Sequence, residues 1–342
     1  MHRTTACRLL VSSRRATQAA IPPHPLLPNV LSNRLQIEGR LGHPALDIRI
    51  LRALEEHRKY AKPFGKRIIF EYETNACKTL SMYLPYESAP DRSRRPLFDR
   101  VHEALVLVAH VLVDGSQHKI AVSSGFAVDV PAHDSSVVIS CAHTLEEIRH
   151  SSIFKSSSSN GGTFVITSSM DVHPVSSILS SLPRSDLIAY SLHPCVSLAA
   201  TLPVNPYPAP LETPTRCPLV SFESPEPNEK GNRRNDWLSW KDGVVNSRWV
   251  KGKILGYRDR AGREAQPGTY DHLSHMLFST MPSPGSSGAP IIDEENGSVI
   301  GVITGHGMVN RIEGQRGFGT PAEAIYEMFS LPGLQQFSSK GH

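Results

Sequence analysis

The stretch Gly285-Ser286-Ser287-Gly288-Ala289-Pro290 stands directly before an apolar pair, Ile291-Ile292, which is typical of a β-strand. A loop of such small residues can hold a serine hydroxyl in the open and aim backbone N–H groups at a neighbouring point. Acyl transfer requires both a nucleophile and a preorganised site for an oxyanion. A flexible surface loop could have the same composition, so the functional interpretation depends on the segments upstream.

Two upstream segments fit that interpretation. The run Val137-Val138-Ile139-Ser140-Cys141-Ala142-His143 is an apolar strand that ends on small residues and a histidine. The run Ser185-Asp186-Leu187-Ile188-Ala189-Tyr190 begins a second apolar strand with an aspartate. Asp186 follows His143 by 43 residues, and Ser287 follows Asp186 by 101 residues.

The three segments, in this order, resemble the motifs of the trypsin-like (chymotrypsin-clan) serine peptidases. The family motifs Thr-Ala-Ala-His, Asp-Ile-Ala-Leu and Gly-x-Ser-Gly-Gly-Pro correspond here to Ser140–His143, Asp186–Ala189 and Gly285–Pro290. Pro284 before the serine loop makes the resemblance strongest to the HtrA-like branch, although we expect no PDZ domain after the peptidase. The resemblance extends from about residue 104 to about residue 329.

The chemistry explains why these residue types must converge. A serine hydroxyl is a poor nucleophile at neutral pH and needs an imidazole that accepts its proton. The imidazole in turn needs a carboxylate that fixes its tautomer. We therefore predict Ser287 as nucleophile, His143 as general base and acid, and Asp186 as the group that orients it. The backbone N–H groups of Gly285 and Ser287 are the predicted oxyanion hole.

Alternatives remain open at this stage. Ser286 is an adjacent candidate for the nucleophile, and Cys141 is a second one of different chemistry. The chain could also be a catalytically inactive trypsin-like module that only binds peptides, because a fold does not guarantee a function.

The resemblance implies an all-β protein of two packed six-stranded antiparallel β-barrels, with the predicted triad in the cleft between them. The 24 glycines and 27 prolines agree with many short strands joined by turns. For the first barrel the sequence predicts strands at residues 104–113, 120–130, 137–140, 162–168 and 187–192. For the second it predicts strands at 219–222, 249–257, 275–279, 291–292, 299–305 and 318–320, followed by a short C-terminal helix at 321–329.

A separate N-terminal extension precedes the barrels. Apolar residues recur with helical spacing over residues 44–61, which predicts an amphipathic helix. Residues 66–72 predict a strand, and the Pro-, Ser- and Arg-rich residues 88–96 predict a linker. The resulting division is 1–37 (transit peptide), 38–97 (extension), 98–201 (barrel with His143 and Asp186) and 202–342 (barrel with Ser287).

The first 37 residues contain five arginines, several hydroxyl residues and no acidic residue. This composition is typical of a mitochondrial transit peptide and predicts a mitochondrial, or otherwise intracellular, protein. Without those five arginines the formal charge falls from +4 to −1, so the net positive charge of the whole chain does not indicate nucleic-acid binding. The basic run Lys230–Arg234 near three tryptophans is better explained as a surface loop than as an RNA or DNA surface.

The five cysteines are scattered and form no metal-ligand pattern, and Thr144 stands where secreted relatives usually have a cysteine. We therefore predict a disulfide-free protein that needs neither metal nor cofactor. No apolar run is long enough to span a membrane as a helix. The oligomeric state stays open.

The family resemblance also predicts how substrate binds. Met281, six residues before the nucleophile, would lie at the base of the S1 pocket, with Thr304, Gly305 and His306 as its wall. With no acidic residue at the base, we expect an apolar or medium-sized P1 side chain rather than Lys or Arg. The partner would be a protein or peptide segment that binds in extended conformation by strand addition.

Overall fold

The computed structural model describes residues 44–58, 64–131, 133–156, 158–222 and 236–331. The predicted transit peptide and the basic run at 230–234 lie outside these residues. Within them, no helix combines the length and apolar character that crossing a bilayer would require.

Six antiparallel strands close into the first barrel, in the order β2-β3-β4-β7-β6-β5. Their bounds are β2 (Leu105–Asp114), β3 (Gln117–Val128), β4 (Val137–Cys141), β5 (Asn160–Ile166), β6 (Val172–Leu182) and β7 (Leu187–Leu192). Helix α4 (His143–Arg149) follows β4, and the short 3₁₀ turns η2 (Ile153–Lys155) and η3 (Pro183–Ser185) lie in the loops.

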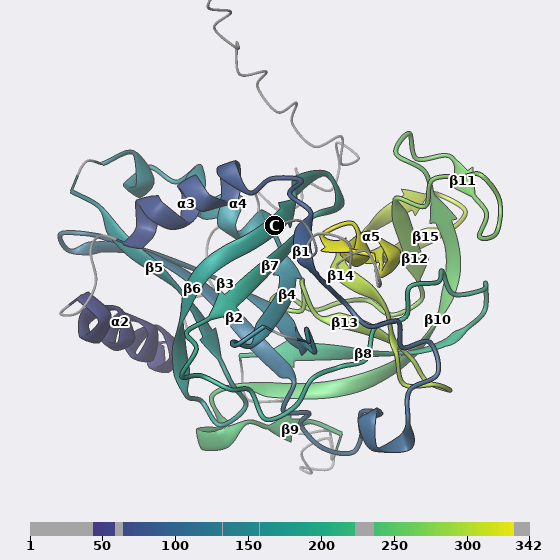
Figure 1. Cartoon of the computed structure of the whole chain (residues 1–342), viewed down its shortest axis with the longest axis horizontal. Helices are drawn as coiled ribbons and strands as arrows, with labels where there is room; N and C mark the ends of the chain where they lie inside the picture. The colour runs from purple at the N-terminus through teal and green to yellow at the C-terminus, as the bar shows by residue number, and fades with distance from the viewer. Residues whose placement is uncertain (1–43, 59–63, 132, 157, 223–235, 332–342) are drawn as a thin grey trace, which may run out of the picture.

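A second ring of six strands forms because β8 pairs with both β10 and β13. The ring contains β8 (Pro214–Ser221), β10 (Asn246–Arg258), β12 (His275–Phe278), β15 (Gly314–Pro321), β14 (Val299–Asn310) and β13 (Pro290–Asp293). Two short strands, β9 (Leu238–Ser239) and β11 (Glu264–Ala265), pair with β10, and the turn η4 (Lys241–Gly243) follows β9. The predicted class, two six-stranded antiparallel barrels, is confirmed, and Figure 1 shows them side by side.

Strand β6 is the one barrel strand that the sequence did not predict. Its run of serines does not have the apolar alternation of a half-buried strand. Two of those serines are fully buried and bind the N-terminal extension: Ser180 Oγ donates to the carbonyl of Lys78 at 2.6 Å, and Ser181 Oγ donates to that of Tyr72 at 3.1 Å. The serine hydroxyls that interrupt the apolar pattern of β6 therefore hydrogen-bond the N-terminal extension to the first barrel.

Two helices of the extension cover the first barrel, α2 (Pro44–Arg58) and α3 (Phe64–Thr74). Alternate residues of β2 belong to two different buried clusters, one shared with each helix. Leu107, Ala109 and Val111 join a buried cluster with α2, whereas Val106 and Val108 join one with α3. Strand β2 is consequently buried along both faces over its first eight residues.

The predicted strand at residues 66–72 is wrong, because these residues lie in α3. Ile68, Ile69 and Tyr72 are buried with helical spacing against the barrel, whereas Phe70 is 66% exposed. Glu71 also accepts the backbone N–H of Ile178 at 3.0 Å. A short apolar run is compatible with either a buried helix or a strand. Here the residues pack against the barrel with helical spacing, so the helix forms.

Residues 80–96 form the last part of the extension and contact the segment that follows the second barrel. Strand β1 (Leu80–Tyr83) pairs in parallel with β16 (Phe329–Ser330). The predicted linker at 88–96 contains a 3₁₀ turn, η1 (Arg92–Arg94), and Arg94 forms an ion pair with Glu87 at 2.8 Å. The predicted C-terminal helix is a short α5 (Glu323–Tyr326).

Candidate active site

The pairing of β4 with β7 brings His143 and Asp186 together. Cys141 at the end of β4 lies opposite Leu187 at the start of β7. His143 therefore begins α4 just beyond one strand while Asp186 immediately precedes the other. Asp186 has a left-handed backbone, with φ of 55°, which an aspartate tolerates better than most residues.

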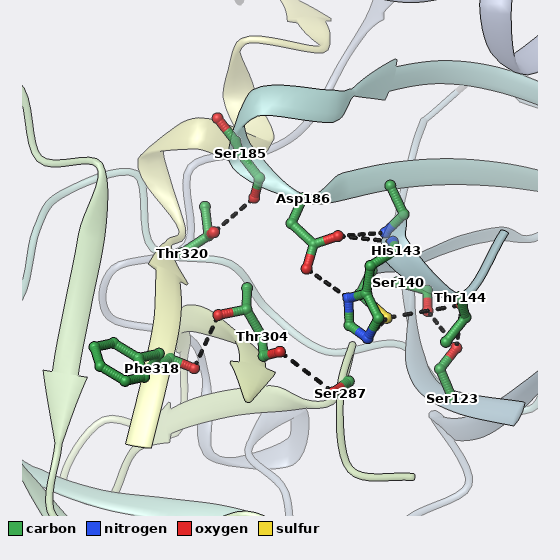
Figure 2. A network of polar contacts seen from close by, with 12 residues as sticks. Ser123, Ser140, His143, Thr144, Ser185, Asp186, Ser287, Thr304, Phe318 and Thr320 are labelled. Atoms are coloured by element: carbon green, nitrogen blue, oxygen red, sulfur yellow. Dashed lines mark hydrogen bonds and ion pairs between the residues drawn. The ribbon is translucent and has the colours of Figure 1, made fainter. Parts of the chain in front are cut away.

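The carboxylate of Asp186 holds both the side chain and the backbone of the histidine segment (Figure 2). Its Oδ2 atom lies 2.6 Å from Nδ1 of His143. Its Oδ1 atom accepts the backbone N–H of Ala142 at 3.0 Å and that of His143 at 2.8 Å. The Asp186 side chain is 8% exposed and the His143 side chain 23%, so the contact is largely shielded from water. This geometry places the proton on Nδ1 and leaves Nε2 as the nitrogen that can accept a proton.

The electrostatics of this contact act on the imidazole in opposite directions. Burial of the ring disfavours its charged form, but the carboxylate of Asp186 and, after it, the sulfur of Cys141 outweigh burial and raise the pKa of His143 above its ordinary value. The charged imidazolium is therefore stabilised at this position, which is what proton transfer from a hydroxyl requires.

The loop that carries Ser287 is bonded to both barrels. The N–H of Gly288 donates to the carbonyl of Ile303 in β14 at 2.7 Å, and the N–H of Ser124 in β3 donates to the carbonyl of Ser287 at 2.8 Å. Gly288 has a φ of +85°, and a Cβ atom there would lie 2.1 Å from the carbonyl oxygen of Ser124. Only glycine fits at this close approach.

Figure 2 shows Ser287 on the side of the His143 imidazole away from Asp186. Its Oγ donates to the carbonyl of Thr304 at 3.4 Å. Among the described residues no hydrogen bond joins this Oγ to Nε2 of His143, and Nε2 lies 3.8 Å from Cys141 Sγ. Catalytic hydrogen bonds are commonly long or misaligned before substrate binds.

The two predicted oxyanion donors have no acceptor within the described part of the chain: neither the N–H of Gly285 nor that of Ser287 makes a hydrogen bond there. By contrast, the N–H of Ser286 donates to the carbonyl of Ser283 at 3.0 Å. The Ser286 side chain is fully buried, and its Oγ accepts the N–H of Val220 at 3.0 Å. Ser286 thus has a structural position, which favours Ser287 as the nucleophile.

The predicted substrate-binding residues lie in two separate segments of the second barrel, strand β14 and the loop after β12. Thr304, Gly305 and His306 lie along β14, next to Ser287 through the Thr304 carbonyl, and His306 is exposed. Met281 is partly buried in the loop after β12. Their roles in binding stay predictions.

Ser124 is not among the site residues that the sequence predicts. The structure shows its hydroxyl against the serine loop, 2.7 Å from the carbonyl of Gly285. Cys141, the alternative nucleophile, is fully buried and does not reach the surface. The four cysteines of the described residues are all free.

Comparison with known proteins identifies the family of this chain. The chain matches the trypsin-like peptidase domain family over residues 123–302. No curated protein matches it. Among solved structures, the active form of the Rv3671c protease from M. tuberculosis matches with 18% identity and a TM-score of 0.42, covering 73% of this chain and 89% of that chain. The inactive form of the Rv3671c protease matches with 17% identity and a TM-score of 0.38, covering 66% and 87%. Because the family match covers more than half of the 342 residues and includes His143, Asp186 and Ser287, the chain belongs to the trypsin-like peptidase domain family.

Proposed function

We propose that this protein is a serine endopeptidase, in which Ser287, His143 and Asp186 form the catalytic triad. The observation that carries the proposal is the contact of Asp186 with both the ring and the backbone of His143, beside a serine loop whose two N–H groups have no acceptor in the described chain. This set supplies a nucleophile, an oriented base and an oxyanion site at one place.

The proposed reaction begins when the Ser287 hydroxyl turns from the Thr304 carbonyl toward Nε2 of His143. Oγ attacks the carbonyl carbon of the scissile peptide bond while Nε2 takes its proton. The N–H groups of Gly285 and Ser287 then hydrogen-bond the oxyanion of the tetrahedral intermediate. When the C–N bond breaks, the imidazolium gives its proton to the leaving amine, and an acyl ester on Ser287 remains.

Water completes the proposed cycle. His143 accepts a proton from a water molecule whose oxygen attacks the ester carbon, and then returns a proton to Ser287 Oγ as the C–O bond breaks. Asp186 stays ionised throughout and stabilises the imidazolium. The chemistry of these steps requires no bound metal or cofactor.

A fluorophosphonate probe tests the nucleophile, because it phosphonylates a serine only where a base and an oxyanion site act together. We expect the wild-type protein to be labelled and Ser287→Ala to lose labelling. Ser286→Ala and Cys141→Ala test the two rival nucleophiles, and each should keep labelling. Loss of labelling in Cys141→Ala with retention in Ser287→Ala would contradict the proposal.

One observation favours a second candidate, a peptide-binding module without catalysis. The hydroxyl of Ser287 donates to Thr304 rather than to His143 in this structure. If the folded wild-type protein is never labelled and cleaves no peptide in a diverse library, yet binds extended peptides, this second function is correct. The same library reports specificity: we propose that Met281, Thr304, Gly305 and His306 select an apolar P1 residue. Cleavage mainly after Lys or Arg would contradict that specificity.

A further inference from the structure

The side chain of Ser124 makes a contact between the barrels that the catalytic scheme does not use. Ser124 belongs to β3 of the first barrel and is 3% exposed. Its Oγ donates to the carbonyl of Gly285 at 2.7 Å, and its N–H donates to the carbonyl of Ser287 at 2.8 Å. The two acceptors thus belong to the two residues whose N–H groups form the proposed oxyanion hole.

These two bonds restrict how the serine loop can rotate. Because each peptide unit is planar, fixing the carbonyl of Gly285 also fixes the N–H of Ser286. That N–H is bonded in turn to the carbonyl of Ser283 at 3.0 Å. Gly285 has a φ of +87°, a conformation that glycine can leave easily unless other contacts hold it. The Ser124 hydroxyl is the side-chain contact that holds the carbonyl of this residue.

Ser124 is itself held in place. Its carbonyl accepts the Ser140 hydroxyl at 2.6 Å and is in close contact with Gly288. Its strand pairs with β2 through Leu107 on one side and with β4 on the other. A rigid strand of the first barrel thereby fixes a glycine-rich loop of the second.

We propose that Ser124 is a positioning residue for oxyanion stabilisation, whose hydroxyl keeps Gly285 in the conformation that directs its N–H at the developing charge. The inference rests on the proposed peptidase function. Oxyanion donors accelerate the chemical step because they are fixed in place before charge develops. Loss of the hydroxyl should therefore lower kcat more than it raises KM.

Ser124→Ala removes the hydroxyl and keeps the backbone bond to Ser287. Ser123→Ala is the matched control, because Ser123 is the neighbouring, fully buried serine whose hydroxyl contacts only Ser140 and Thr144 among the described residues. Ser124→Thr retains the hydroxyl and tests rescue. The measurements are kcat and KM on a peptide substrate, affinity for a peptide boronic acid that forms a tetrahedral adduct, and the thermal midpoint.

For Ser124→Ala we expect kcat to fall about tenfold, a smaller loss than the 10²–10³-fold effect of deleting an oxyanion donor. Boronic acid affinity should fall by a similar factor with KM nearly unchanged, and Ser124→Thr should recover most of the loss. If Ser124→Ala has the kcat of Ser123→Ala while wild-type protein is active and labelled, this inference is wrong and the proposed function stands. A wild-type protein that is neither labelled nor active overturns both.

Discussion

Substitution of Gly288 tests how closely the two barrels must approach at the proposed active site. A methyl group at this position would lie 2.1 Å from the carbonyl oxygen of Ser124, 2.6 Å from Ser140 Oγ and 2.9 Å from the N–H nitrogen of Cys141. Two of these atoms are backbone, and real Cβ atoms essentially never come within 3.0 Å of such neighbours. Relief of the shortest overlap therefore requires the serine loop and β3 to separate by about 1 Å, and a displacement of that size can cost about 10²-fold in rate.

The matched control is Gly262, whose φ of +79° is close to the +85° of Gly288 but whose added Cβ would meet nothing within 4 Å. Both variants place an alanine in a left-handed backbone conformation, which should lower the free energy of unfolding by about 1–2 kcal/mol each. Only Gly288→Ala adds the steric overlap at the site.

Both variants should be assayed for the rate of fluorophosphonate labelling and for the free energy of unfolding in urea. We expect Gly262→Ala to be labelled at the wild-type rate. Gly288→Ala should be labelled about 10²-fold more slowly even where it remains folded. Equal labelling rates in the two variants would refute the reasoning, because they would show that the approach of the barrels at Gly288 does not position Ser287.

Three further predictions follow from the site and the extension. Asp186→Asn should lower kcat about 10⁴-fold, because the amide no longer fixes the tautomer of His143. Since Asp186 raises the pKa of that histidine, the variant's residual activity should also persist to lower pH than wild-type activity, as a pH–rate profile would show. Ile68→Ala, at a buried position in α3, should destabilise the protein by about 2–5 kcal/mol, whereas Phe70→Ala on the exposed face should change little; equal urea midpoints would contradict this packing. Burial, and after it the charge of His143, lowers the pKa of His110 from 6.5 to about 3, so the folded protein binds fewer protons there than the unfolded chain. Stability should therefore fall by about 1.4 kcal/mol per pH unit as the pH drops below 6.5, and His110→Gln should show a shallower fall in acid unfolding.

The sequence was most informative where strands are apolar and motifs are local. The predicted strand at 187–192 is confirmed with the same bounds as β7, and the short motifs around His143 and Asp186 lie together in the structure. These segments could be recognised because β4 and β7 are buried along their whole length, which gives short, continuous, mainly apolar runs. Strand β6 was missed because its buried residues include serines that bind another segment.

Other features depend on partners that are distant in sequence. The helix α3 needs the barrel surface to bury Ile68 and Tyr72, and nothing local distinguishes it from a strand. The contact of Ser124 with Gly285 spans 161 residues, so no local pattern could show it. The conformation of the Ser287 hydroxyl is equally a tertiary property, set by the neighbouring carbonyl of Thr304.

The parallel pairing of β1 with β16 has a consequence for synthesis of the chain. Leu80 in β1 bonds to Ser330 in β16 across a separation of 250 residues. At about 5–20 residues per second, a ribosome takes roughly 12–50 s to make that stretch. Throughout that interval Leu80 and Leu84, both buried in the finished protein, lack the partners that cover them from the second barrel's closing segment. A nascent chain halted before Phe329 should therefore expose apolar surface to chaperones, and the extension reaches its final contacts only when β16 has been translated.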